Sequence, residues 1–243
     1  MVVSDSLIYY IDVGVQRSDD PNSNNRLNNL VNMEPEIYFI NTTEPASRKS
    51  DDGFYYYELD GVNDYLRINT SDNPNINVRG DVTVGCWCRL DDNEPFSVVS
   101  KYNQYILGQN DSTNYDMTFI VNTTSWYPNN YDTAIWGDQS HIDKTKWHYW
   151  VGTYRKNSDP DQNGFTSLYC DGEPLATDLD TFRGNGDNAG VLNDDPNGEV
   201  KFFKRDAGSN IHQGAIGLIH CHSRALSAQE IRQNYISTRG RFQ

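Results

Sequence analysis

The 243-residue sequence has no apolar run that approaches the ~20 residues of a membrane-spanning helix, so we expect no membrane insertion. Positive charge is also scarce: 20 Lys and Arg stand against 34 Asp and Glu, which gives a formal net charge of −14. Because nucleic-acid phosphates attract a basic surface, we expect no nucleic-acid partner. The first residues show neither a basic segment nor a continuous apolar segment, so we expect no signal peptide and synthesis in the cytoplasm.

Cysteine is scarce too, with four residues in a chain long enough to bury an ample core without disulfides. Without a secretory signal, the expected state of these cysteines is the free thiol. Aromatic residues, by contrast, make up 12% of the chain and include 16 tyrosines. Disordered chains lack such residues, so the composition predicts a folded, acidic protein.

Short alternating segments dominate the sequence and are separated by clusters of Asn, Asp, Gly and Pro. Within 81–90, one face of the expected strand carries Val82, Val84, Cys86 and Cys88. A similar composition predicts further strands at 96–100, 105–107, 117–121, 147–154, 165–170, 200–203 and 215–222. Many short strands with one helix are typical of an antiparallel sandwich or barrel.

The expected helix lies near the C-terminus, at about 228–238. Ser227 and Glu230 have the spacing of a capping box, in which each satisfies an amide of the other. Leu226 and Ile231 stand where a hydrophobic staple requires apolar residues. The pattern therefore predicts a single, well-marked helix that packs against the sheets.

No repeat or low-complexity linker divides the sequence, so we expect 1–243 to form a single domain. The polar stretch 177–198 has the length of a linker, but the segments on both sides belong to the same strand pattern. We therefore expect it to be a large surface loop.

Five segments, taken in order, resemble those of concanavalin A-like, laminin G-like domains: 59–66, 82–88, 147–154, 168–172 and 219–227. The resemblance implies an all-β fold, a two-sheet antiparallel jelly-roll sandwich closed by one short C-terminal helix. It also places Cys88, Cys170 and Cys221 where relatives carry core Val or Ile, which predicts buried thiols.

The end of the chain, 230–242, resembles the C-terminal tail of phage and other viral virion proteins of that family. This resemblance implies a virion structural protein made in the host cytoplasm, either a capsid decoration or a tail-fibre or other appendage subunit. Its partners would be other virion proteins. The segments expected to contact them are 1–32, 108–139 and 177–198.

Enzyme activity is not expected. The sequence contains neither a Gly-x-Ser-x-Gly nucleophile elbow nor a phosphate-binding loop. Glucan hydrolases that share the concanavalin A-like fold resemble one another in a strand with two catalytic carboxylates. The nearest match here, 58–63, ends in Asn63 and lies in a different strand of the family pattern. A glucanase-like hydrolase therefore remains only the minor alternative.

Calcium is the one cofactor that the resemblance suggests, because laminin G-like relatives hold it at the rim of the sandwich. The residues that would bind it here are Asp60, Asn63 and Asp64. A second segment, 159–164, begins like an EF-hand loop, but Cys170 stands where that loop needs a bidentate Glu. We expect this segment to be a polar hairpin loop instead.

Three histidines raise the question of a zinc site. In a strand, His220 and His222 share one face while Cys221 points to the other, so these three cannot form one tetrahedral site. His148 would add a third nitrogen from a neighbouring strand. We expect solvated histidines on a sheet face rather than a metal centre.

One polar stretch carries exposed aromatic residues together with amide and carboxylate groups: Trp126, Tyr127, Asn129, Tyr131, Asp132 and Trp136. Sugar rings stack on aromatic faces while amides and carboxylates take the hydroxyls, so this composition suits a lectin rim. It equally suits a contact with a neighbouring subunit. The third alternative is that Trp136 packs into the core of its own domain.

The sequence thus predicts a non-enzymatic virion structural protein with a lectin-like fold that contacts host-surface glycans. The alternative from a different class is a stand-alone calcium-dependent carbohydrate-binding module. The two differ in whether the protein assembles with other chains of a particle.

Overall fold

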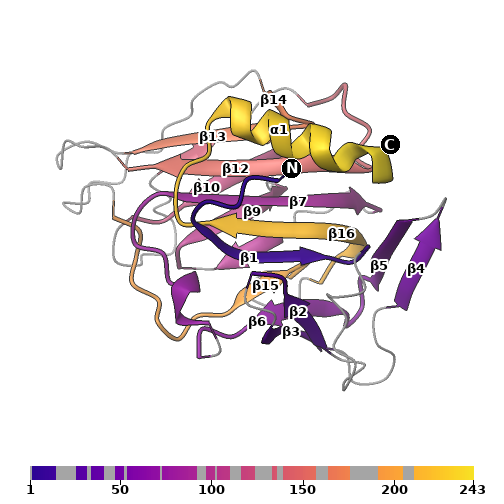
Figure 1. Ribbon diagram of the computed structural model, residues 1–243, viewed down its shortest axis with the longest axis horizontal. Coiled ribbons are helices and arrows are strands. Elements are labelled where there is room, and N and C mark those ends of the chain that lie inside the picture. The colour runs from indigo at the N-terminus through magenta and orange to yellow at the C-terminus, as the bar shows by residue number, and fades with distance from the viewer. Residues whose placement is uncertain are drawn as a thin grey trace.

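The computed structural model consists of two antiparallel sheets packed face to face, with one helix on the outer face of one sheet (Figure 1). The structure describes residues 2–14, 26–31, 34–40, 47–51, 54–71, 73–91, 97–101, 103–109, 116–123, 133–135, 139–156, 164–175, 191–204 and 211–243. This architecture confirms the predicted two-sheet sandwich. None of the helices in these ranges is both long and apolar enough to cross a bilayer.

The first sheet, sheet A, is arranged around strand β16. On one side, β16 pairs with β7 in antiparallel fashion. Its other side is divided between two strands: β5 pairs along 213–216 and β1 along 218–222. In spatial order the strands are β14 (Glu173–Pro174), β13 (Phe165–Cys170), β12 (His148–Arg155), β7 (Val82–Leu90), β16 (Gln213–His222), β5 (Phe54–Asp60) and β4 (Ser47–Asp51), with β1 (Leu7–Asp12) beside β16.

The second sheet, sheet B, lies under sheet A and completes the sandwich (Figure 1). Its strands in spatial order are β11 (Thr133–Ile135), β10 (Met117–Val121), β9 (Tyr105–Gln109), β8 (Ser97–Lys101), β15 (Val200–Phe202), β6 (Tyr65–Ile68), β3 (Glu34–Ile40) and β2 (Arg26–Asn29). A short 3-10 helix, η2 (Pro74–Ile76), follows β6. The order β8–β15–β6 brings segments from distant parts of the sequence side by side, which matters for the polar groove described below.

The core between the sheets is built by the alternation that the sequence shows in β7. Val82, Val84, Cys86 and Cys88 are all fully buried in one cluster with large residues of both sheets, such as Phe119. Period-2 alternation places these residues on the inner face, so the prediction for this strand is confirmed.

The other face of sheet A is also buried, because the C-terminal segment covers it. Trp87 points outward from β7 into a second apolar cluster with Tyr149, Leu226 and Ile231. The indole Nε1 of Trp87 donates to the Thr238 hydroxyl over 2.8 Å, which satisfies a polar group that burial would otherwise leave orphaned. Sheet A is therefore the middle layer of three at this point.

The covering helix is α1 (Ala228–Thr238), at the position expected from the sequence. The Ser227 hydroxyl accepts from the Glu230 amide, and the Glu230 carboxylate accepts from the Ser227 amide over 2.8 Å, so the capping box forms as predicted. Thr83 of β7 links the approach to the helix to the sheet, since its hydroxyl donates to Arg224 O and accepts from Leu226 N, each over 2.8 Å. A final 3-10 turn, η3 (Arg239–Arg241), continues the helix.

Part of the N-terminal segment is described, and it contributes strands to both sheets. Residues 7–12 form β1 and pair with β16 of the same chain, and 26–29 form β2 and pair with β3. Arg241 reaches from the C-terminus to Asp12, with its Nη1 2.6 Å from Asp12 Oδ1. The strands of this segment thus complete the sheets of their own chain, and contact with other virion proteins stays a prediction.

Candidate functional site

The aromatic residues predicted to form a lectin rim or a subunit contact lie outside the described residues. These are Trp126, Tyr127, Asn129, Tyr131, Asp132 and Trp136. The structure places only the short strand between them, β11, which pairs with β10 at the edge of sheet B. The site therefore stays a prediction.

The predicted calcium residues lie in the tight turn between β5 and β6. Asp60 Oδ1 accepts from the amides of Val62 and Asn63, over 2.8 and 3.2 Å. Burial disfavours the charge on Asp60, but these backbone N–H groups outweigh it and hold its pKa below the usual value. The exposed Asp60 carboxylate is thus already engaged in holding the turn.

Gly61 gives that turn its shape, with a φ of +75° that other L-residues rarely adopt. Asp64 is buried, whereas Asp60 is exposed. Among the described residues, neither aspartate belongs to a cluster of three or more His, Cys, Asp and Glu donors. Asn63 Oδ1 is buried and has no hydrogen-bond partner, so one oxygen of the predicted set is available. Calcium binding stays a prediction.

A polar groove of about 450 Å³ lies where the segment after β6 meets the segment before β15. Its lining residues are amides, hydroxyls, one carboxylate and small residues: Asn69, Thr70, Ser71, Pro196, Asn197, Gly198 and Glu199. This volume falls within the range of small-ligand sites. The sequence marks 195–198 only as a turn, and pairing of Ile68 with Val200 is what brings the two walls together.

Hydrogen bonds and ion pairs hold the walls of this groove in place. The fully buried Lys101 Nζ donates to Asp195 O over 2.6 Å and lies 3.3 Å from Asp195 Oδ2. Across the groove, the Thr70 hydroxyl donates to Gly198 O. Glu199 forms ion pairs with Arg67 and Lys201, at 2.8 and 3.2 Å. These contacts hold the walls in place and leave no unpaired carboxylate among the lining residues.

The two histidines of β16 are not solvated as expected, because α1 and the N-terminal segment cover this face. His220 and His222 are buried, with ring centroids 5.3 Å apart. The Tyr149 hydroxyl lies 2.5 Å from His220 Nε2. Burial lowers the pKa of both rings, and for His220 the neighbouring His222 acts in the same direction. These histidines belong to the interior of the domain.

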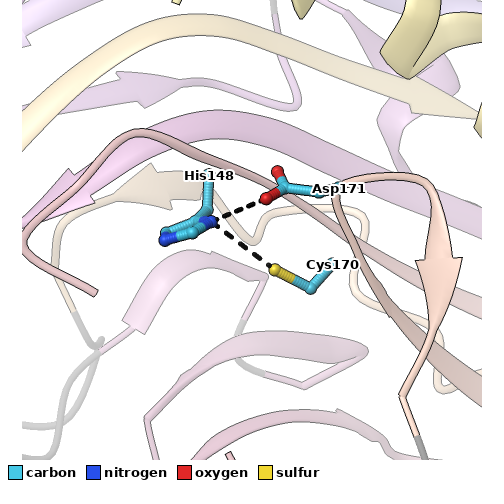
Figure 2. Close-up of side chains that lie close together, drawn as sticks. All are labelled: His148, Cys170 and Asp171. Carbon is cyan, nitrogen blue, oxygen red and sulfur yellow. Dashed lines mark hydrogen bonds and ion pairs between the residues drawn. The ribbon is translucent and has the colours of Figure 1, made fainter. Parts of the chain in front are cut away.

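His148, by contrast, lies in a second cluster at the edge of sheet A, together with Cys170 and Asp171 (Figure 2). His148 begins β12, Cys170 ends β13, and Asp171 follows in a tight turn with a φ of +52°. His148 and Cys170 are 22 positions apart in the sequence, and only the pairing of β12 with β13 brings them together.

Residues 60–232 match the family model of the concanavalin A-like lectin/glucanases superfamily, a laminin G type. The chain belongs to this superfamily. The predicted resemblance is therefore confirmed at the level of the family. No curated protein sequence matches the chain.

Solved structures with this fold include several toxin domains. The receptor-binding domain of botulinum neurotoxin C/D mosaic serotype is 13% identical, with a TM-score of 0.59, and the match covers 96% of this chain and 51% of that chain. The binding domain of Paraclostridial mosquitocidal protein 1 is 15% identical, with a TM-score of 0.60 and coverage of 96% and 52%.

The binding domain of botulinum neurotoxin DC, solved in complex with rat synaptotagmin II, is 13% identical, with a TM-score of 0.62 and coverage of 96% and 51%. The chain thus spans about half the length of these structures. At these identities the likeness shows a shared fold.

Proposed function

We propose that this chain is a non-enzymatic recognition subunit of a virus particle, a capsid decoration or appendage protein that contacts host-surface glycans. The main support for a recognition role is the polar groove lined by 69–71 and 196–199 on a lectin-like sandwich. The toxin domains with a similar fold, which are receptor-binding or binding domains, support the same class of role. The virion setting is supported by the resemblance of the C-terminal tail.

The chemistry of the groove indicates which glycans suit it. Amide and hydroxyl groups line it, and its one carboxylate, Glu199, is paired with Arg67 and Lys201. The chain as a whole carries a net charge of −14, which repels acidic sugars at long range. Neutral, hydroxyl-rich oligosaccharides are therefore the ligands that we expect.

A glycan array probed with the purified chain, with and without EDTA, tests the recognition role. We expect binding to neutral glycans that is lost when Asn197, an exposed groove residue, is replaced by Trp, which would fill the groove. Gln229→Ala, on the exposed face of α1, is the matched control and should leave binding unchanged. Binding that survives Asn197→Trp would contradict the assignment of this groove.

The virion role needs a separate measurement, which is copurification of the chain with virus particles. A particle subunit should form a stable contact that buries more than about 1,000 Å² with another virion protein. A monomer that binds glycan tightly, requires calcium and is absent from particles would instead favour the alternative, a stand-alone calcium-dependent carbohydrate-binding module. Hydrolysis of a bound glucan would contradict the non-enzymatic role.

A further inference from the structure

Three side chains of different chemistry converge at the edge of sheet A. His148 Nδ1 lies 2.8 Å from Asp171 Oδ2 and 3.8 Å from Cys170 Sγ. Dashed lines mark both contacts in Figure 2. All three donor atoms lie within 4.8 Å of one another. In a tetrahedral zinc site with bonds of about 2.0–2.3 Å, neighbouring ligand atoms are about 3.3–3.7 Å apart. The His148 nitrogen and the Cys170 sulfur already lie at about this separation, whereas the Asp171 carboxylate would have to move away from His148 to make room for an ion.

Two of these donors, His148 and Asp171, are oriented by a further contact. The second ring nitrogen of His148, Nε2, lies 3.0 Å from the carbonyl oxygen of Asp143, to which it can only donate. The second oxygen of Asp171, Oδ1, accepts from the Tyr149 amide over 2.9 Å. A ring N–H given to a backbone carbonyl and a carboxylate held by an amide are the supports that metal ligands usually have.

These contacts determine which ring nitrogen of His148 carries a lone pair. With Nε2–H donated to Asp143 O, the neutral ring has a lone pair on Nδ1, and that lone pair faces the carboxylate oxygen of Asp171. Two lone pairs at this distance repel each other unless a positive centre lies between them. A proton on Nδ1 would relieve the repulsion between His148 and Asp171, but it would leave the nearby Cys170 sulfur without a role.

We propose that His148, Cys170 and Asp171 bind one divalent transition-metal ion of the zinc class, with a water molecule as fourth ligand. The donor set of imidazole, thiolate and carboxylate selects this class, since calcium and magnesium take oxygen ligands. His148 and Asp171 retain partial exposure, with 16% and 26% of their side chains accessible, which leaves room for that water.

A bound dication would balance the negative charges of its two anionic ligands, the Cys170 thiolate and the Asp171 carboxylate. The ion would join β12 to the turn after β13, at the edge of sheet A. This inference does not depend on the proposed recognition function.

A zinc-binding measurement on the full chain tests the proposal. The protein is prepared without a histidine tag and is first stripped of metal with a chelator. Atomic emission after dialysis against Zn²⁺ should find about one ion per chain, and added Zn²⁺ should raise the melting temperature. The variants Cys170→Ala, His148→Gln and Asp171→Asn should each lose the ion, whereas Cys221→Ala and His141→Gln should keep it. Cys221 is a buried free thiol outside the cluster, and His141 is exposed.

A second measurement needs no variant. During long incubation with an alkylating reagent, Zn²⁺ should slow the labelling of Cys170 more than that of the other three cysteines, as mapped by mass spectrometry. Co²⁺ in place of Zn²⁺ should show thiolate-to-cobalt charge-transfer absorption. Absence of bound zinc in the wild type, unchanged labelling of Cys170, or equal binding of Ca²⁺ would each overturn the proposal.

Discussion

The ring of Phe242 lies stacked on the indole of Trp87, with ring centroids 4.7 Å apart and planes 15° apart. This contact joins the last residues of the chain to a central strand of sheet A (Figure 1). It also explains a glycine in the neighbouring strand: a Cβ on Gly217 would lie 2.3 Å from the Phe242 ring. Gly217 is the residue skipped in the pairing of β16 with β7, so a bulge in the sheet makes room for the C-terminal tail.

Replacing Phe242 by Ala should lower the free energy of unfolding by about 3–5 kcal/mol, as for other buried aromatic residues. Phe242 is buried in the cluster that covers Trp87, so the substitution leaves a cavity on the outer face of sheet A. Urea unfolding measures the change. Ile236→Ala, on the exposed face of α1, is the control and should change stability by less than about 0.5 kcal/mol. Equal effects of the two variants would mean that the tail does not stabilise the sheet.

The capping box at the start of α1 gives a smaller, separate effect. Ser227→Ala removes the hydroxyl that accepts from the Glu230 amide and should cost about 1 kcal/mol. Gln229→Ala lies in the same turn but takes no part in the cap, so it should leave the unfolding midpoint unchanged. Leu226→Ala, which removes a buried side chain from the same cluster as Phe242, should cost about 2–5 kcal/mol.

The four cysteines should react with a thiol reagent in a definite order. All four are free and buried. Burial raises the pKa of the Cys88 and Cys170 thiols. It also raises the pKa of the Cys221 thiol, to about 12. Thiolates react and thiols do not, so native metal-free protein should label slowly. Cys170, with 7% of its surface accessible against 0% for the others, should label first. Mass spectrometry of the unreduced protein that showed disulfides would contradict this prediction.

Mild acid should destabilise the protein through its buried histidines. Burial lowers the pKa of His220 and His222 in the folded state, so below about pH 6.5 the unfolded chain binds more protons than the folded one. The free energy of unfolding should therefore fall as the pH drops below that value. His148 acts in the opposite sense: burial opposes its charge, but Asp171 outweighs this and raises its pKa, so its contribution is lost as the pH rises.

Urea midpoints of chelator-treated protein between pH 7.5 and 5.5 measure this dependence. His222→Gln should flatten the decline, and His148→Gln should make it steeper. The exposed His141 is the control site, and His141→Gln should leave the slope as it is. A midpoint that rises toward pH 5.5 would show that the buried pair does not govern the response.

Much of the fold can be predicted from local sequence. Alternation in 82–88 identifies a strand with one core face, and Ser227 with Glu230 identifies the start of α1 to the residue. These signals are local, since a strand repeats every two residues and a cap needs only its own turn. The candidate sites are different. The predicted rim residues lie outside the described residues, and the groove formed by 69–71 and 196–199 has no local signature.

By itself, then, the sequence determined the family, the helix, the burial of the cysteines and many of the strands, but it did not identify β1 to β4. Tertiary structure alone decided the environment of the polar residues. Period-2 alternation placed His220 and His222 on one face of a strand, but it could not show that α1 covers that face and buries them. Likewise, His148 and Asp171 meet only because β12 and β13 pair in one register. Alternation predicts which residues of a strand share a face. It does not predict which layer packs on that face or which residues lie beside it, because these depend on contacts between segments far apart in the chain.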